Sequence, residues 1–197
     1  MKKQVLFFFL FFLSSTVLPI IIESDQISEI QKHLIHDKKS LVIFDLDNVI
    51  GAVDSYIGTD QWFYHMVNKH TDSGLTSEQA VCHVLPTYCS IQFSIPLALI
   101  EKDTPKFIKK LQEKKIPTIC LTTRSYYLAD RTLEQLNGVG ISFLKNNLEK
   151  TISFTLPAPC LYKNGILFSG RNNKGDVLLT FLKSLNISPD KVIFIDD

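Results

Sequence analysis

The sequence predicts an α/β fold in which an open parallel sheet has helices on both faces. Short apolar runs at residues 41–44, 116–123 and 192–195 have the profile of strands buried on both faces. Segments with helical spacing separate these runs, and that alternation favours parallel pairing. The length of 197 residues and the hydrophobic content of 45% suit a single globular domain and exclude disordered, collagen-like and coiled-coil proteins.

The charge balance narrows the classes of partner. The formal net charge is +1, from 21 basic and 20 acidic residues. A dedicated nucleic-acid-binding protein would show a basic excess or a basic stripe, so no nucleic-acid partner is expected.

The first 24 residues have the pattern of an export signal. Lys2 and Lys3 precede an apolar run over residues 5–22. This pattern predicts a signal peptide over residues 1–24 that is cleaved before Asp25, and a mature protein that is periplasmic or secreted. The run of 18 residues is also near the lower length limit of a membrane span. An uncleaved anchor is therefore the alternative, and the membrane is expected to be contacted only through this segment.

The next elements are a helix at 27–36, the first strand at 41–44 and an insertion. Residues 51–103 are expected to form a small helical insertion, which divides the core into residues 25–50 and 104–197. Thr76 and Gln79 form a plausible capping box for a short helix that ends at Leu85. Another helix is expected around the aromatic stretch Trp62-Phe63-Tyr64, which suits either the core of the insertion or a substrate-recognition face.

Helix and strand patterns alternate again along the rest of the chain, after residue 103. The expected elements are a helix from Thr104-Pro105, a strand at 116–123, a helix at 125–136, a strand at 139–143, a hairpin over 160–169, a helix at 174–185 and a strand at 192–195. Pro105 suits the first turn of a helix. Asn164-Gly165 between apolar flanks is the strongest short hairpin signal.

The four cysteines bear on the redox state. Export makes disulfides possible, and Cys82 and Cys89 are close enough in sequence to pair across the insertion. Cys120 lies within a strand pattern and is expected to be a buried thiol, while Cys160 has no obvious partner. The sequence has no C-x-x-C motif or Cys/His cluster, so a zinc site is not expected.

Polar residues occur where the expected strands end. They are Asp45 and Asp47 after the first strand, Thr122 and Thr123 at the end of the second, Lys174 at the start of the last helix, and Asp196 and Asp197 after the last strand. Ligands of open parallel sheets bind at the carboxyl ends of the strands. These residues are therefore expected to converge on one crevice.

The residue types at this crevice suit phosphoryl chemistry. Asp45 could attack a phosphoryl group and form an aspartyl-phosphate, while Asp47 serves as the general acid and base. Mg²⁺ held by carboxylates would neutralise the phosphate. Thr122 and Lys174 could hold the phosphoryl oxygens, and Thr123 is expected to be a further phosphate-binding residue. Arg124 could contact the phosphate or cap the edge of the sheet.

Four short motifs resemble those of the haloacid-dehalogenase-like (HAD) superfamily over about residues 40–197. They are Phe44-Asp45-Leu46-Asp47-Asn48-Val49, Ile119-Cys120-Leu121-Thr122, Lys174-Gly175 and Ile195-Asp196-Asp197. The resemblance implies a Rossmann-like sheet, with the insertion as a small helical cap. The aromatic Trp62-Phe63 segment further resembles an exported, uncharacterised bacterial branch of that superfamily.

The resemblance also implies an activity and the role of each residue. The protein would be a Mg²⁺-dependent phosphatase acting on a small phosphorylated substrate. Asp45 would be the nucleophile and a metal ligand, and Asp47 the acid/base with its backbone carbonyl on the metal. Thr122, Thr123 and Lys174 would bind phosphate, and Asp197, supported by Asp196, would complete the metal site.

The sequence departs from that pattern at its end. It stops at Asp197, directly after the fourth motif, where members of the superfamily usually continue. The expected explanations are a fragment or a weakened metal site. The alternative function is therefore a truncated, inactive protein with a binding role only.

Overall fold

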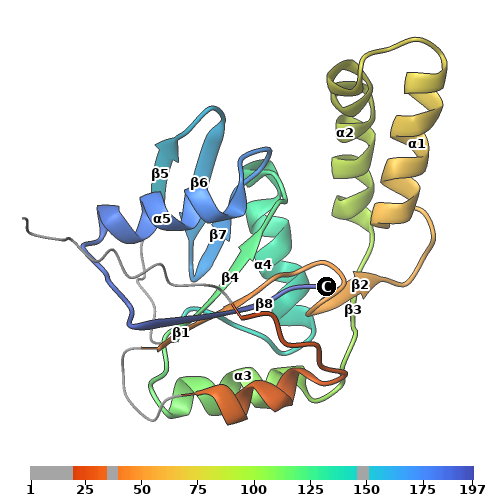
Figure 1. Cartoon of the computed structure of the whole chain (residues 1–197). Helices are drawn as coiled ribbons and strands as arrows, with labels where there is room; N and C mark the ends of the chain where they lie inside the picture. The colour runs from red at the N-terminus through yellow and green to blue at the C-terminus, as the bar shows by residue number, and fades with distance from the viewer. Residues whose placement is uncertain (1–19, 35–39, 146–150) are drawn as a thin grey trace, which may run out of the picture.

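Four parallel strands form the centre of the molecule. The computed structural model describes residues 20–34, 40–145 and 151–197. The parallel strands are β7 (Ile166–Phe168), β4 (Thr118–Thr122), β1 (Ser40–Phe44) and β8 (Lys191–Ile195), and β6 (Pro159–Lys163) and β5 (Thr151–Thr155) extend the sheet in antiparallel fashion. Figure 1 shows the order β5-β6-β7-β4-β1-β8. The predicted α/β class is confirmed, but the sheet is mixed rather than wholly parallel.

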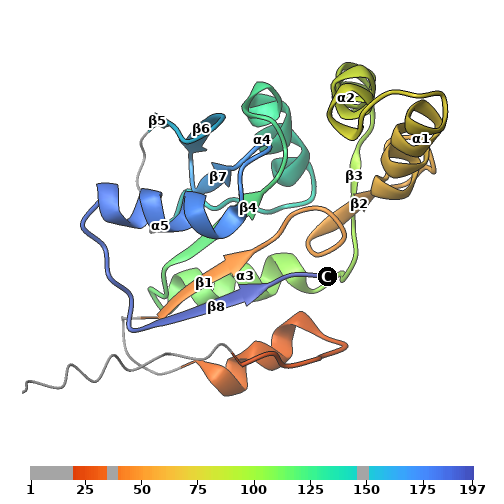
Figure 2. The ribbon, with the colours of Figure 1, turned by 45° about the horizontal axis from the view of Figure 1, so that its top comes forward.

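Helices cover both faces of this sheet. They are α3 (Thr104–Glu113) and α4 (Ala129–Gly138) on one side and α5 (Lys174–Ser184) on the other. Figure 1 shows α3 and α5 on opposite sides of β1 and β8, and Figure 2 shows these two strands side by side. The proposed signal peptide and its alternative, an anchor, lie mostly outside the described residues, because residues 1–19 are not among them.

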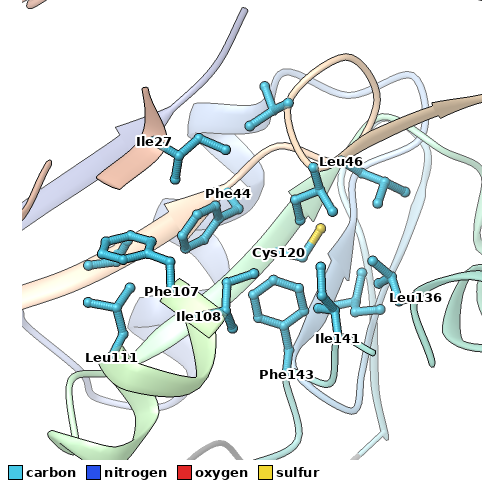
Figure 3. Close-up of a cluster of buried hydrophobic side chains, with 14 of the residues drawn as sticks. Ile27, Phe44, Leu46, Phe107, Ile108, Leu111, Cys120, Leu136, Ile141 and Phe143 are labelled. Carbon is cyan, nitrogen blue, oxygen red and sulfur yellow. The ribbon is translucent and has the colours of Figure 1, made fainter. Parts of the chain in front are cut away.

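Side chains alternate between the two faces along the central strands. Phe44 and Cys120 point to the α3 side, where they join Phe107 and Leu111 in the cluster of Figure 3. Ile43, one residue before Phe44, joins Val177 and Phe181 of α5 on the other side. Each fully buried side chain of this size stabilises the fold by about 2 kcal/mol. Because successive side chains of a strand point to opposite faces, each central strand contributes to both hydrophobic cores.

Residues 51–103 leave the sheet through a two-stranded stem. The stem consists of β2 (Gly51–Val53) and β3 (Leu97–Leu99), and between them lie α1 (Asp60–Asp72) and α2 (Ser77–Ser94). Figure 1 shows the α1–α2 hairpin standing to one side of the sheet. A Cβ atom on Gly51 would lie 2.6 Å from Leu97 Cγ, so the close approach of the two strands requires glycine. The division of the chain into domains stays a prediction.

Two expectations for the insertion need correction. The capping box of Thr76 and Gln79 is present, but α2 continues through Pro86 to Ser94 rather than ending at Leu85. Because proline has no backbone N–H, a helix loses one backbone hydrogen bond at that position. Here Val84 and Gln92, on either side of Pro86, are both buried and hold the helix in place. The stem strands were also missed, because each has only three residues.

The expected strand at 139–143 does not form. The Ile141 N–H donates to Leu136 O at 2.9 Å, and Gln112 Nε2 donates to Ser142 O at 2.7 Å. These bonds occupy backbone groups that a strand ladder would need. Ile141 and Phe143 are nevertheless buried, so the apolar pattern marks a core loop.

Two expected helices are shorter or divided. The first is a 3₁₀-helix, η1 (Ile27–His33), in which the spacing of Ile27 and Ile30 matches three residues per turn. The segment at 125–136 divides into a 3₁₀ turn, η2 (Tyr126–Leu128), followed by α4. The hairpin over 160–169 is confirmed, with Asn164 and Gly165 at φ 50° and 85° in its turn.

The possible Cys82–Cys89 disulfide does not form. Both residues lie on α2, seven positions apart, which places them about 10 Å apart along the helix axis. Disulfides need Cα atoms within about 7 Å of each other. All four cysteines are free thiols, and Cys120 and Cys160 are buried.

Candidate functional site

Three carboxylates meet at the carboxyl ends of β1 and β8. Each of Asp45, Asp196 and Asp197 offers an oxygen atom within 4.8 Å of the others, and we call this group the carboxylate cluster. The parallel register sets Phe44 beside Ile195, and the Asp45 N–H donates to Ile195 O at 2.9 Å. Asp45 and Asp196, which are 151 positions apart in the sequence, therefore converge because their strands are neighbours.

Lys174 lies against the carboxylate cluster at the start of α5. Its Nζ atom is 3.0 Å from Asp45 Oδ2 and 3.1 Å from Asp196 Oδ1, and it lies 5.3 Å from the centre of the Phe194 ring. Asn173 begins the helix, since its Oδ1 atom accepts from the N–H groups of Gly175 and Asp176. Burial opposes the ammonium charge, but the two aspartates outweigh it and raise the pKa of Lys174.

Asp45 is the buried member of the cluster. Only 8% of it is exposed, and this burial raises its pKa from 3.8 to about 7. The Lys174 ammonium and the Leu46 N–H lower the pKa in part, while the charge of Asp196 raises it further. A carboxylate with this pKa is poorly compensated, so a further positive charge would stabilise its ionised form.

Asp47 lies apart from the cluster in an ion pair with the buried Arg124. Arg124 holds it with two bonds, from Nε to Oδ2 at 2.8 Å and from Nη2 to Oδ1 at 2.7 Å. Burial works against the charge of Arg124, but the charge of Asp47 and its hydrogen bonds raise the arginine pKa. This two-bond geometry directs the Asp47 oxygens to the guanidinium.

Helical residues complete the surroundings of Arg124. Its Nη1 atom donates to Gln135 Oε1 at 2.6 Å and to Thr132 Oγ1 at 3.3 Å, and its Nη2 atom is 3.4 Å from Gln92 Oε1. Gln92 also donates to Gly58 O at 2.8 Å. Sequence reasoning missed these three partners, because a polar residue inside a helix carries no motif. Arg124 therefore links the sheet edge, α4 and the base of the α1–α2 hairpin.

The two threonines after β4 differ in position. Thr122 is buried, and its Oγ1 atom accepts from the Arg124 N–H at 3.1 Å. Thr123 lines the cavity beside the site. Thus Lys174 reaches the carboxylate cluster, Thr123 reaches the cavity, and Thr122 supports the backbone at Arg124.

A cavity of about 770 Å³ lies between the sheet edge and the α1–α2 hairpin. Asp45, Asp47 and Asp60 contribute its carboxylates, and Arg124 and Arg171 contribute its cations. Aromatic side chains come from both sides, namely Phe63, Tyr64, Tyr88, Tyr126 and Tyr127. Trp62 instead packs against the small core of the hairpin, as Phe63 also does. A cavity of this size and lining suits a small organic molecule.

Asn48 connects this cavity to the carboxylate cluster. Its Nδ2 atom donates to Asp60 Oδ2 at 3.2 Å and to Asp197 Oδ2 at 3.3 Å. It holds this position with a φ of 64°, a left-handed conformation that asparagine tolerates. Burial, followed by the charges of Asp47 and Asp197, raises the pKa of Asp60. The acidic site therefore extends beyond the three carboxylates.

Comparison with known proteins shows which family and which relatives the chain is similar to. A family model described as "Protein of unknown function (DUF2608)" matches residues 23–197. A Chlamydia trachomatis protein is 31% identical over 96% of this chain, and proteins of Chlamydia muridarum and Chlamydia pneumoniae are 26% and 30% identical over 87% and 100% of it. The chain spans 74%, 65% and 75% of the lengths of these relatives.

All three relatives are named "putative outer membrane protein". These names are consistent with export. Over residues 20–34, 40–145 and 151–197, no helix is both long enough and apolar enough to cross a membrane.

The family match overturns the expected superfamily and activity. It is to a family of unknown function and not to the haloacid-dehalogenase-like superfamily, so that resemblance was wrong as an assignment. The predicted phosphatase activity, in which magnesium serves a hydrolase reaction, is contradicted together with the superfamily assignment. Four short motifs misled because each needs only a strand end or a helix start with one or two polar residues.

Proposed function

This chain belongs to the family described as protein of unknown function (DUF2608), and on that footing we propose that it is an exported protein whose carboxylate cluster binds a hard divalent cation. The convergence of Asp45, Asp196 and Asp197 within 4.8 Å carries the proposal. Carboxylate oxygens are the ligands that hard divalent cations prefer.

The charges at the cluster match a divalent ion. Three carboxylates and the ammonium of Lys174 together leave two negative charges, and Asp45 is buried among them. A cation with two positive charges would balance this excess. It would also offset the cost of ionising Asp45, whose pKa burial raises to about 7. The earlier expectation of Mg²⁺ is one case of this chemistry and stays a prediction.

The adjacent cavity supports a role in binding a small ligand. Asp45 belongs both to the cluster and to the cavity lining, so a bound cation would lie at the border of the two. Such a cation attracts an anionic or carbonyl oxygen of a ligand. Thr123 lines the cavity, and contacts from Thr122, Thr123 and Lys174 to a phosphate group stay predictions. We therefore propose that the ligand is a small molecule with an anionic group.

The proposed export depends on the first 24 residues and on the names of the relatives. Those names are consistent with an extracytoplasmic location. Fusing residues 1–24 to a reporter that is active only after export tests this step. A matched fusion in which Lys2 and Lys3 are replaced by glutamate should lose the signal, since a positive start is part of the export pattern.

Calorimetric titration of the purified chain with Mg²⁺, Mn²⁺ and Ca²⁺ tests cation binding. Asp45→Asn and Asp197→Asn should each weaken binding at least about tenfold, since each removes a ligand and a charge. Asp54→Asn is the matched control, because Asp54 is an exposed aspartate outside the cluster. Binding in Asp45→Asn equal to the wild type, with helical content unchanged, would overturn the proposal.

A further inference from the structure

Two histidines face each other across the α1–α2 hairpin, remote in the sequence from the carboxylate cluster. The ring centres of His70 and His83 are 4.7 Å apart, and the ring planes make an angle of 65°. We propose that this pair is a second metal site, which binds a transition-metal ion such as Cu²⁺, Ni²⁺ or Zn²⁺ through its imidazole nitrogens. The proposal is independent of the cation site at the sheet edge.

The hairpin holds both rings on helical backbone. His70 lies in the last turn of α1, and its carbonyl oxygen accepts from the Ser73 N–H at 3.2 Å and the Ser73 Oγ at 2.7 Å. His83 lies on α2 next to the buried Val84. Val84 packs with Val67 and Ala80 between the two helices. The distance between the histidine backbones is therefore set by the core of the hairpin.

The imidazole nitrogens are available for a ligand. In the part of the chain that the structure describes, neither ring has a hydrogen-bond or ion-pair partner, and the ring contact between them is their shared interaction. His83 is exposed and His70 is partly exposed, so both rings can be reached from solvent. A neutral imidazole carries one nitrogen with a free lone pair, and each ring can offer that nitrogen to an ion.

The nitrogen donors of the two histidines prefer a different class of metal ion from the oxygen donors of the carboxylate cluster. Imidazole suits copper, nickel and zinc, whereas magnesium and calcium prefer oxygen ligands. Metal–nitrogen bonds of about 2.0–2.1 Å are within reach of two rings already in contact, through small rotations of their side chains. With two protein ligands, water would fill the remaining positions. An ion bound there would join α1 to α2 beyond their turn.

Titration of the untagged chain with Cu²⁺, Ni²⁺ and Zn²⁺ tests the site. His70→Asn and His83→Asn should each weaken binding at least about tenfold, since each removes one of two ligands. His65→Asn is the matched control, because His65 is an exposed histidine on the same helix as His70. In the Asp45→Asn background, adding His70→Asn should still weaken binding at least about tenfold, which separates this site from the proposed function.

Spectroscopy supplies a second readout that packing alone would not move. Electron paramagnetic resonance of the Cu²⁺-loaded chain should show two nitrogen ligands, reduced to one in either variant. Equal loss of binding in His65→Asn, or no measurable binding by the wild type with its helical content intact, would overturn the proposal.

Discussion

Asp45 and Asp47 lie two residues apart on the same loop, yet their surroundings are opposite. Asp45 shares one ammonium with Asp196 and is left with a pKa raised to about 7. Asp47 has two hydrogen bonds to a buried guanidinium that serves no other carboxylate in the described structure. One region is therefore short of positive charge, and the other is fully paired. A site with too little positive charge is suited to bind a cation, whereas a carboxylate with its own guanidinium partner is suited to stabilise the fold.

The largest expected effect comes from removing the paired guanidinium. Arg124→Met should lower the free energy of unfolding by about 3–5 kcal/mol, since it leaves Asp47 without its buried partner. Urea denaturation measures this loss. Arg171→Met is the control, because Arg171 is largely exposed and its nearest carboxylate contact is 3.8 Å away. Equal losses of unfolding free energy in the two variants would show that the Arg124–Asp47 pair stabilises the fold no more than an exposed arginine does.

The next effect compares the two aspartates directly. Asp47→Asn should destabilise the chain by about 2–4 kcal/mol, because Arg124 would keep its burial and lose its counter-charge. Asp45→Asn should cause no comparable loss at pH 8, since the ionised form of Asp45 is already unfavourable. Thermal and urea unfolding of both variants would check this. A greater loss in Asp45→Asn would reverse the assignment of the two regions.

The pH dependence sharpens the same contrast. The folded-state pKa of Asp45 is raised from 3.8 to about 7, so the folded state binds its proton more tightly than the unfolded state does. The resulting stabilisation is complete below about pH 4 and is lost as the pH rises through about 7. The wild-type chain in a chelator should lose stability over this range relative to Asp45→Asn. Parallel melting curves for the two proteins between pH 4 and 8 would contradict this.

The smallest effect concerns the two threonines. Thr122→Val should cost about 1 kcal/mol, because the buried Arg124 N–H loses its acceptor. Thr123→Val should change stability by less than about 0.5 kcal/mol, since Thr123 faces the cavity. Paired urea unfolding curves measure the difference. Similar values for the two would mean that Thr122 does not support the backbone at Arg124.

The sequence predicted those elements whose signals are local. Strands β1, β4 and β8 show short apolar runs, although Val192 and Phe194 of β8 are exposed rather than buried as expected. The hairpin turn follows from Asn164-Gly165. The proximity of Asp45 to Asp196 follows from the parallel pairing of two such strands. It needs no knowledge of the loops between them.

Features that depend on distant partners were not predictable. The residues at 139–143 resemble a strand, but Gln112 and the end of α4 take up their backbone groups. Gln92, Thr132 and Gln135 surround Arg124 from two helices, and nothing in the local sequence marks them. The superfamily assignment failed for a related reason, since motifs of one or two polar residues at element ends recur in unrelated proteins.

The two-stranded stem separates two properties of the molecule. The carboxylate cluster is anchored wholly on β1 and β8, whereas one wall of the cavity stands on α1 and α2 beyond β2 and β3. The stem thus supports that wall separately from the strands that carry the three aspartates. Substitutions on α1 or α2 can therefore change the cavity lining while the strands that carry the three aspartates stay the same.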